Sequence, residues 1–395
     1  MAQEAIAARV MPLPSEPRPL TQCIGRTLRQ DVYAERDNPP FDRVCMDGIA
    51  ISSAAFGQGV RRFKIEALQA AGAPPLTLSR SDNAVEVMTG AMLPWGTDCV
   101  IPLEEYDVAD EIVSLRERTL GEAYRNVQRR GSDSEPGIAM LKTGALLGAA
   151  EIAVVASAGL ASVLVSRQPN FMVVSTGDEL IEPGAPIAAH QVRRSNAYAV
   201  LAALAAHGFD SVANDHLLDD ETMLRERLTR HLAEHDVLVL SGGVSKGKFD
   251  LVPKTLKSLG VQEVFYQVAQ RPGMPMWFGV GTRGQLVFGL PGNPVSTLVC
   301  LIRYVLPAVQ LAMGTAAAPA EPIALASPFK LSRASMAYFL PVTVRHDQHA
   351  QLIAEPRQPN GSGDFLALTG TVGFVELPPR TEEFPAGYIA GLYRW

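Results

Sequence analysis

The hydrophobic and polar positions of the chain divide it into regions of different character. In residues 46–128 and 322–395, short apolar runs alternate with polar residues and turn-rich segments, a pattern that predicts strands. In residues 168–314, short apolar runs alternate with longer segments in which leucines recur at helical spacing, as at Leu224 and Leu228. Strands that alternate with helices predict a three-layer α/β domain, with a mostly parallel sheet covered on both faces.

The same pattern predicts individual elements. In the first β-rich region we expect strands at 61–68, 84–88, 99–103 and 111–115. In the C-terminal region, where a small antiparallel barrel or sandwich is expected, strands are predicted at 323–326, 338–345, 351–355, 372–377 and 388–394. The α/β region should contain strands at 171–175, 236–240, 261–268, 277–280 and 285–290.

Helices are predicted from capping and stop signals. In the α/β region they should run from a cap at Ser195 to His207, from a cap at Asp219 or Asp220, from about 253 to 259, and from 294 to about 313 with a kink at Pro307. Outside it we expect one or two helices in the linker-like residues 1–45, and a helix at 149–158 closed by Gly159.

One glycine-rich loop stands out because it follows a buried strand directly and precedes a helix. Strand 236–240 leads into Ser241, Gly242, Gly243, Ser245 and Lys246. This arrangement presents backbone N–H groups to an anion, and glycines allow the backbone to approach a ligand closely. Two interpretations remain open: a phosphate or oxyanion site, with Asp250 supplying a carboxylate for a metal or a proton, or a tight turn with glycines for geometry alone.

Three loops should meet at the edge of the predicted sheet where the strands have their carboxyl ends. Ligands of α/β sheets bind at this edge. The three loops are 175–184, 241–250 and 290–294. Acidic residues gather in them and in the turn after Leu218: Asp178, Glu179, Asp219, Asp220 and Asp250. Each alone is a typical helix cap or solvated turn residue, but several together indicate a Mg²⁺-assisted phosphate site.

Two catalytic motifs occur in the sequence without the context that they need. Residues 243–247 match G-x-S-x-G, but Ser245 lies five residues past Leu240, whereas a nucleophile elbow follows its strand at once. Residues 231–235 match the H-x-x-E-H zinc motif, but they fall in the last turn of a predicted crossover helix, where histidines complement the helix dipole and face solvent. We therefore expect neither a serine hydrolase nor a zinc protease.

Composition excludes several other classes of protein. The net charge of −6 argues against nucleic-acid binding, and no run of 18 apolar residues predicts a membrane span. The N-terminus lacks the apolar core of a signal peptide, and the four cysteines are far apart. These features favour a reducing, cytoplasmic location. Outside the α/β region, 39–48, 88–91 and 126–133 are turn-rich polar loops, of which the last contributes Arg129 and Arg130, two guanidinium groups suited to an oxyanion.

Taken together, these segments resemble the molybdopterin molybdotransferases, the MoeA and gephyrin E-domain family. PPFDRVCMDGIAI is similar to the family segment PPFDxSxMDGYA, VEVMTGAMLPWGTDCVIPLEE to MTGAxxPxGxDxVVxxEE, and NVQRRGSD to NVRRxGxD. STGDEL, SNAY, SGGVS, RPG and GLPGNPVS then follow in the family's order. The resemblance covers nearly the whole chain.

The resemblance implies a domain plan and a reaction. It implies a split first domain (1–45 and 129–167), an inserted β-rich domain (46–128), an α/β molybdopterin-binding domain (168–314) and a C-terminal β domain (318–395). It implies a homodimer whose site lies between two subunits, adenylylated molybdopterin and molybdate as substrates, AMP as product and Mg²⁺ as the assisting ion. Further partners implied are the molybdopterin adenylyltransferase and molybdoenzyme chaperones.

The resemblance also implies roles for particular residues. Asp47, Glu179, Asp219 and Asp250 would be catalytic, with Glu179 and Asp250 as metal ligands. The substrate-binding residues would be Thr89, Arg129, Arg130, Asp133, Ser241, Gly242, Gly243, Ser245, Lys246, Arg271, Pro291, Gly292, Asn293, Pro294 and, as a weaker match, Ser362.

The chain departs from the family pattern at six of these or neighbouring positions: Arg194, Lys246, Lys248, Gln267, Arg271 and Met274. Four of the six are positively charged, so we expect anion-binding charge to have moved to the glycine loop and to the segment before the helix at Ser195. A diverged, non-catalytic protein that binds molybdopterin or a nucleotide is the alternative to an enzyme.

Overall fold

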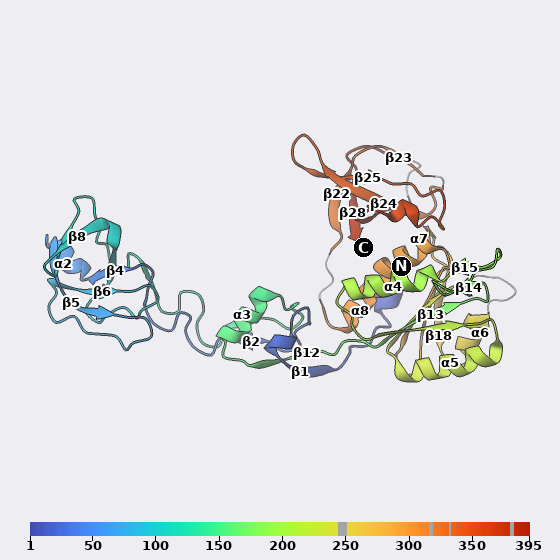
Figure 1. Ribbon diagram of the computed structural model, residues 1–395, viewed down its shortest axis with the longest axis horizontal. Helices are drawn as coiled ribbons and strands as arrows, with labels where there is room; N and C mark the ends of the chain where they lie inside the picture. The colour runs from blue at the N-terminus through green and yellow to red at the C-terminus, as the bar shows by residue number, and fades with distance from the viewer. Residues whose placement is uncertain (244–250, 316–318, 332, 380–382) are drawn as a thin grey trace.

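The computed structural model describes residues 1–243, 251–315, 319–331, 333–379 and 383–395, and the molecule that they form is elongated. Figure 1 shows a β-rich unit at one end, a small unit around α3 in the middle, and the α/β unit with the C-terminal β unit at the other end. The predicted combination of α/β and β-rich parts is confirmed.

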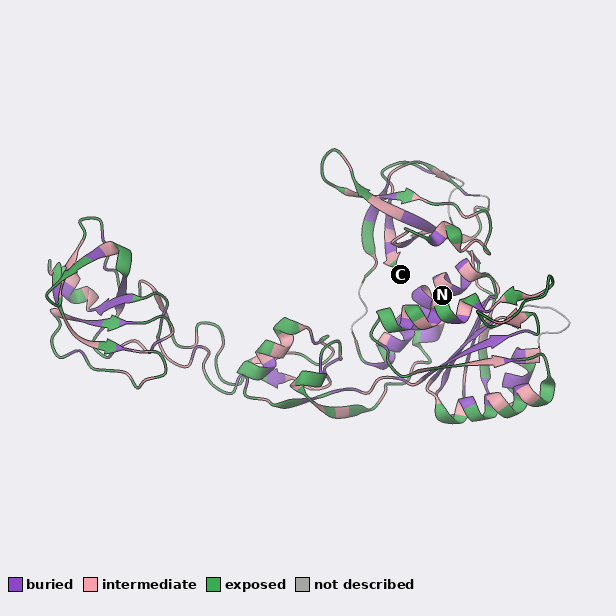
Figure 2. Ribbon diagram, viewed as in Figure 1, coloured by how far each residue is buried: buried purple, intermediate pink, exposed green. Residues whose placement is uncertain are grey.

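The sheet of the α/β unit has six strands in the order β16-β13-β17-β21-β20-β18. Its strands are β13 (Phe171–Thr176), β16 (Val212–Leu217), β17 (Val237–Ser241), β18 (Gln262–Tyr266), β20 (Trp277–Val280) and β21 (Leu286–Leu290). The first four in the spatial order are parallel, whereas β20 runs antiparallel to both of its neighbours. Figure 2 shows the central strands buried, as expected for a sheet covered on both faces.

Helices cover both faces of this sheet. Their bounds are α4 (Ser195–Ala206), α5 (Glu221–Glu234), α6 (Leu251–Ser258), α7 (Pro294–Cys300) and α8 (Leu306–Ala312). Helices α4, α7 and α8 share one apolar core with the sheet, and α5 and α6 share a second core on the other face. The predicted cap at Asp220 is confirmed, since its side chain accepts a hydrogen bond from the Met223 N–H at 2.7 Å. The predicted cap at Ser195 is wrong, because Arg194 occupies the N-cap position of α4.

The long apolar helix contains a π-helical turn. Residues Leu301–Val305 form this turn between α7 and α8, directly before Pro307, which lacks the N–H that a regular helix needs. The continuous helix Pro294–Ala312 is long and apolar enough to cross a membrane, but 72% of its most apolar window is buried inside the protein. It is therefore the core helix of the α/β unit.

The small middle unit is built from two separate stretches of chain. It contains η1 (Leu20–Gln22), an antiparallel pair of β1 (Ser15–Pro19) with β12 (Ser162–Ser166), a pair of β2 (Val32–Tyr33) with β11 (Ala139–Leu141), and α3 (Ala149–Ser157). Helix α1 (Ala2–Ala7) lies outside this unit, because Ile6 is buried in the core of the α/β unit. The first residues of the chain thus pack with the α/β unit.

The β-rich unit at the far end is a six-stranded sheet in the order β7-β4-β6-β5-β9-β8 with one short helix. Its elements are β3 (Arg43–Val44), β4 (Gly48–Ile51), α2 (Ser53–Gly57), β5 (Arg62–Gln69), β6 (Asn83–Val87), β7 (Cys99–Pro102), η2 (Leu103–Glu105), β8 (Tyr106–Ala109), β9 (Ile112–Leu115) and β10 (Val127–Gln128). All four predicted strands are confirmed, whereas β4 and β8 of the same sheet and the short strands β3 and β10 were not predicted.

The C-terminal unit closes into a barrel, because β24 pairs with both β25 and β26. Its elements are β22 (Glu321–Leu325), β23 (Phe329–Lys330), β24 (Ala337–His346), β25 (Leu352–Pro356), η4 (Leu366–Leu368), β26 (Gly373–Leu377), β27 (Glu383–Phe384) and β28 (Ile389–Arg394). It is antiparallel except for the pair β22–β25, and β19 (Gln270–Arg271) from the α/β unit adds to its edge.

A partly buried ion pair joins the barrel to the α/β unit. Arg303, in the π-helical turn, donates from Nε to Glu376 of β26 at 2.9 Å and from Nη1 to Gln3 of α1 at 2.6 Å. Phe374 of β26 belongs to the same apolar core as α7 and α8. The barrel therefore packs directly on the long apolar helix.

Candidate functional site

The carboxyl ends of β13, β17 and β21 bring together three loops, as the sequence predicted. Ser175 lies opposite Ser241, and Ser241 lies opposite Leu290, in parallel register. The side chain of Asn196, in the first turn of α4, donates to Ser241 Oγ at 2.9 Å and to the carbonyl of Gly292 at 2.8 Å. One side chain thus ties α4 to two of the loops.

A pocket of about 370 Å³ lies among these loops. Its lining includes Glu179, Ser241, Gly242, Gly292 and Pro294, all of which the sequence placed in the site. Thr176 and Asn196 also line it, and their buried side-chain oxygens Oγ1 and Oδ1 have no hydrogen-bond partner among the residues that the structure describes. Buried polar atoms are rarely left unpaired, so these two oxygens suit a polar ligand.

Gly242 is required by the close approach of two loops. Its φ is +94°, and a Cβ at this position would lie 2.8 Å from the carbonyl oxygen of Thr176. Only glycine tolerates both the positive φ and the contact. This is the close backbone approach that the sequence analysis expected of the glycine-rich loop.

The predicted acidic residues differ in their surroundings. Glu179 is exposed at the mouth of the pocket. Asp219 follows β16, and its backbone N–H donates to Asp178 Oδ1 at 3.0 Å, which brings the two acidic loops together. Asp250, together with Ser245 and Lys246, lies outside the described residues. No group of three metal-ligating side chains occurs in the described part of the chain.

A second pocket of about 370 Å³ lies between the α/β unit and the barrel. The loop that contains Pro291 borders both pockets. The lining of the second pocket also includes Arg271, Asn293 and Ser362. The carbonyl of Ser362 accepts from the Val295 N–H at 3.0 Å, which places the barrel loop against the start of α7. Ser362, the weaker match to the family pattern, therefore lies beside the loop that carries the family motif GLPGNPVS.

The remaining predicted residues form a separate group at the far end of the molecule. Asp47 Oδ1 accepts hydrogen bonds from Thr89 N–H at 2.6 Å and from Thr89 Oγ1 at 2.9 Å. These two bonds lower the pKa of Asp47, so the carboxylate is held ionised. Figure 1 shows this β-rich unit at the opposite end of the chain from the α/β unit. A single chain therefore does not bring Asp47 and Glu179 together.

The segment that follows the β-rich unit holds three more predicted residues. Asp133 accepts two hydrogen bonds from Gln128 Nε2, at 2.8 and 2.9 Å. Arg130 is paired with Asp37, and the guanidinium of Arg129 lies 4.2 Å from the ring centre of Tyr124. Of these contacts, the pair Arg130–Asp37 connects the segment 127–133 to the stretch of chain that leads into the β-rich unit.

The predicted anion-binding role of Arg194 is wrong. Its side chain is only 4% exposed and forms an ion pair with Glu182, so its charge is compensated within the protein. The sequence contains the acidic partner 12 residues upstream, but no local pattern predicts that the two side chains meet.

His231 does not face solvent as predicted. It is buried, and its Nε2 lies 2.7 Å from Asp215 Oδ2, while Arg227 makes two hydrogen bonds to the same carboxylate. Burial lowers the pKa of His231 in spite of the opposing effect of Asp215. The reason lies in helical spacing: His231 follows Leu224 and Leu228 on the stripe of α5 that packs against the sheet.

Comparisons with known proteins agree with this domain composition. Residues 1–159 match the "MoeA N-terminal region (domain I and II)", residues 172–311 match a "Probable molybdopterin binding domain", and residues 324–391 match the "MoeA C-terminal region (domain IV)". These matches define the class: an α/β domain of molybdopterin-binding type flanked by the other MoeA domains.

Individual relatives extend over most of the chain. A molybdopterin molybdenumtransferase of Synechocystis is 39% identical over 94% of this chain and 93% of its own length. Molybdopterin molybdenumtransferase 2 of Mycobacterium tuberculosis is 34% identical over 75% of each chain. The crystal structure of a MoeA protein from Pyrococcus horikosii aligns with a TM-score of 0.79 and 28% identity, covering 100% of this chain and 97% of that one. The chain belongs to the MoeA family of molybdopterin molybdenumtransferases, a family of transferases in molybdenum cofactor biosynthesis.

Proposed function

We propose that the protein transfers molybdenum from molybdate to adenylylated molybdopterin and releases AMP, in the cytoplasm. The supporting observation is the pocket at the carboxyl ends of β13, β17 and β21, which combines a glycine-lined loop, an exposed carboxylate and two unpaired buried oxygens in the MoeA fold. Such a site suits a phosphate-rich ligand, because polar groups converge where the backbone can approach closely.

The donors around this pocket fit Mg²⁺ bound together with a substrate. Mg²⁺ is usually held by one or two carboxylates and completed by substrate phosphates. Glu179 would supply a carboxylate here, with Asp250, which lies outside the described residues, as the second proposed ligand. When bound, the ion would neutralise charge on the phosphoanhydride that joins AMP to the pterin phosphate. Thr176 Oγ1 and Asn196 Oδ1 would orient the substrate, and Asp219 would hold the adjoining acidic loop.

The active protein is, in this proposal, a homodimer. Support comes from the separation of Asp47 and Thr89 from the α/β pocket, because a partner subunit could supply them there. The small middle unit also exposes large apolar side chains that suit a subunit contact: Ile24, Tyr33, Ile138, Leu146 and Leu164. The molybdopterin adenylyltransferase and molybdoenzyme chaperones are proposed as transient partners.

We therefore expect a mass of about 85 kDa by light scattering at micromolar concentration, twice the 42.4 kDa of one chain. Replacing Leu146, which is 56% exposed, by Glu should shift this mass towards the monomer and abolish activity in parallel. Leu366 in the barrel is also exposed, so Leu366→Glu is a matched control that should leave the mass unchanged. A monomer with full activity would contradict the shared site.

Arg271 should contribute to binding at the second pocket. It lines that pocket, and its guanidinium lies 6.0 Å from the Tyr338 ring centre. We expect Arg271→Ala to weaken binding of the adenylylated pterin by roughly ten- to a hundredfold, the usual effect of losing a charge-assisted contact. Calorimetry at low and high salt would measure this, and the loss should be larger at low salt. An affinity equal to that of the wild type at low salt would assign Arg271 to the pocket wall only.

The reaction itself is tested by AMP release from adenylylated molybdopterin. The transferase should release AMP in a molybdate-dependent manner, and chelation of divalent ions should stop it. A protein that bound the pterin tightly without releasing AMP would instead be the non-catalytic binding protein that the sequence left as the alternative. The comparisons do not favour that alternative.

A further inference from the structure

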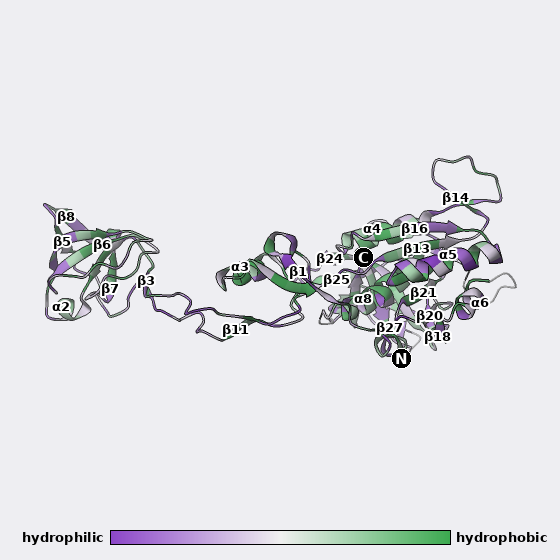
Figure 3. Ribbon diagram, turned by 90° about the horizontal axis from the view of Figure 1, so that it is seen from below, coloured by the Kyte–Doolittle hydropathy of each residue, from purple (hydrophilic) through white to green (hydrophobic). Residues whose placement is uncertain are grey.

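Residues 177–194 connect β13 to α4 at the edge of the first pocket. The two halves of this segment pair through β14 (Leu180–Ile181) and β15 (Val192–Arg193), which run parallel. The Val192 N–H donates to the carbonyl of Glu179 at 2.9 Å, and the Arg194 N–H donates to that of Ile181 at 3.0 Å. Figure 3 shows the chain beyond β14 projecting from the body of the molecule. The position of Glu179 therefore depends on what anchors this segment.

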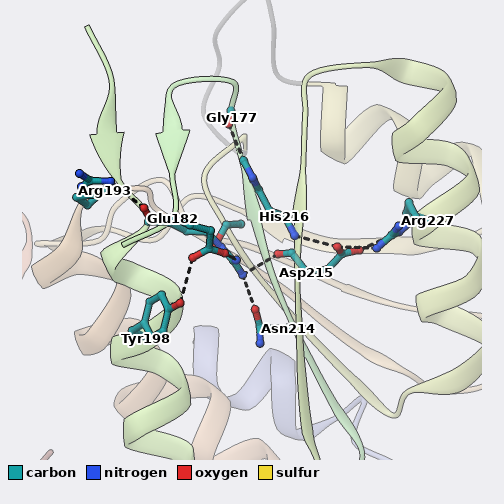
Figure 4. Close-up of polar contacts among 10 residues, drawn as sticks. Gly177, Glu182, Arg193, Tyr198, Asn214, Asp215, His216 and Arg227 are labelled. Atoms are coloured by element: carbon teal, nitrogen blue, oxygen red, sulfur yellow. Dashed lines mark hydrogen bonds and ion pairs between the residues drawn. The ribbon is translucent and has the colours of Figure 1, made fainter. Parts of the chain in front are cut away.

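The anchor is the guanidinium of Arg194, which is almost completely buried. Its Nε donates to Ser175 Oγ of β13 at 3.1 Å, and its Nη2 donates to Asn214 Oδ1 and to the Asp215 carbonyl of β16 at 2.7 and 3.1 Å. Its Nη1 pairs with the carboxylate of Glu182. Figure 4 shows three of these partners, Glu182, Asn214 and Asp215, close together at this edge of the sheet.

Glu182 extends the network to helix α4. Its second oxygen accepts a hydrogen bond from Tyr198 Oη at 3.0 Å, and its backbone carbonyl accepts from Arg193 Nη1 at 2.7 Å. Burial would raise the pKa of Glu182, but the hydrogen bond from Tyr198 and the charge of Arg194 lower it. The carboxylate is thus ionised at neutral pH and bridges Arg194 to α4.

We propose that Arg194 is a positioning residue for the site, and that its pairing with Glu182 holds Glu179 and Asn196 in register across the carboxyl edge of the sheet. Glu179 lies three residues before Glu182 on the anchored segment. Asn196 lies two residues after Arg194 and contacts Ser241 Oγ and the Gly292 carbonyl. The buried guanidinium of Arg194 therefore connects the two walls of the pocket, the wall that carries Glu179 and the wall that carries Asn196. What the two walls do chemically rests on the proposed function.

Arginine suits this role because of its planar fork of donors. The guanidinium satisfies four acceptors in fixed directions, which a lysine ammonium on a flexible stem cannot reproduce. A methionine would fill a similar volume but would leave the Asn214 and Asp215 acceptors unpaired and Glu182 without its cation. Arg194 also lines the pocket, but its guanidinium donates to acceptors of the protein, so its removal should release the segment while Glu179 and Asn196 are kept.

The test compares Arg194→Met, Arg194→Lys and Glu182→Gln in the full-length protein. Hydrogen exchange reports on the amides of residues 180–194, with those of β17 as an internal reference, and AMP release gives kcat and KM. In Arg194→Met we expect the 180–194 amides to exchange about tenfold faster or more while β17 keeps its protection. We expect kcat to fall by about ten- to a hundredfold with a smaller change in KM, because alignment and not binding is lost.

The conservative variants make the effect specific. Arg194→Lys should recover part of kcat, and Glu182→Gln should lower it by about three- to tenfold. The kcat of the double variant Arg194→Met/Glu182→Gln should be no lower than that of Arg194→Met, because the two changes remove the same interaction. Arg345→Met, which removes an exposed ion pair with Glu355 in the barrel, is the control and should change neither readout.

Several outcomes would overturn the proposal. One is an Arg194→Met variant with wild-type kcat. Another is a variant in which kcat falls but the amides of β17 lose as much protection as those of residues 180–194. If Arg194→Met does not fold, Glu182→Gln and Arg194→Lys decide the question, and unchanged exchange and kcat in both would refute it. If the wild type releases no AMP with molybdate, the proposed function fails, whereas the exchange arm still decides whether Arg194 anchors the segment.

Discussion

Asp47→Asn and Glu179→Gln are each expected to lower turnover by about a hundredfold or more, and coexpression of the two variants should restore about a quarter of wild-type activity. Both changes keep the size of the side chain and remove its charge. In Asp47→Asn, the oxygen of the introduced amide could still accept from Thr89, so the fold of that turn should be kept. Loss of turnover would then report on the missing carboxylate.

Recovery on coexpression follows from the arrangement of the two groups of residues. Asp47 and Glu179 lie at opposite ends of one chain, so each site of a dimer would take one residue from each subunit. Half of the randomly formed dimers would contain one variant of each kind, and one of their two sites would then carry both native residues. Tagging the two chains differently allows the mixed dimer to be purified and its turnover to be measured directly.

The matched control is coexpression of Glu179→Gln with Asp219→Asn, used once Asp219→Asn alone has been shown to lower turnover as much as Glu179→Gln does. Both residues lie on the α/β unit, so every site of the mixed dimer would retain one change, and no recovery is expected. Recovery in this control, or none in the mixture of Asp47→Asn with Glu179→Gln, would show that the two groups do not meet across subunits.

Gly242→Ala should have the second large effect on turnover. An added Cβ would lie 2.8 Å from the Thr176 carbonyl and 3.1 Å from Thr176 Oγ1, at a φ of +94°. The positive φ alone costs an alanine about 1–3 kcal/mol, and the clash requires one of the two loops to move. We expect turnover to fall by about tenfold to a hundredfold, because displacements of this size misalign reacting groups.

Gly208→Ala is the control that separates the effect of the positive φ from the effect of the steric clash with Thr176. Gly208 has a φ of +79° at the end of α4, and a Cβ there would meet no atom within 4 Å. It should lower the unfolding temperature, as Gly242→Ala does, but leave kcat unchanged. Measurements of kcat and thermal unfolding for both variants would test this, and equal kcat values would contradict a role for the close approach of the two loops.

Local sequence signals determined the main elements of the fold. Uninterrupted apolar runs predicted β13, β17 and β21, because these strands are buried on both faces and need no polar residue. Cap and stop signals predicted α5 and α3, since Asp220 and Gly159 act on their own neighbours in the chain. The order of the strands also determined which loops share the pocket edge.

The tertiary structure alone decided which polar side chains pair. Strand β16 was not predicted, because Asn214, Asp215 and His216 interrupt its apolar pattern. Their partners Arg194, Arg227 and Gly177 come from distant elements. Likewise the tertiary structure alone places Asp215 within hydrogen-bond distance of the buried His231, and Arg194 is neutralised only because the chain folds back onto Glu182.

The candidate site divides in the same way. The order of the strands predicted which α/β loops share the pocket edge, and the resemblance to the family supplied the proposed residues of the other loops. Their separation into two groups, one near Asp47 and one near Glu179, could not be read from spacing, since it depends on how the middle unit holds the β-rich unit away from the sheet. Distances between residues far apart in sequence are set by the packing of whole units, which no local pattern encodes.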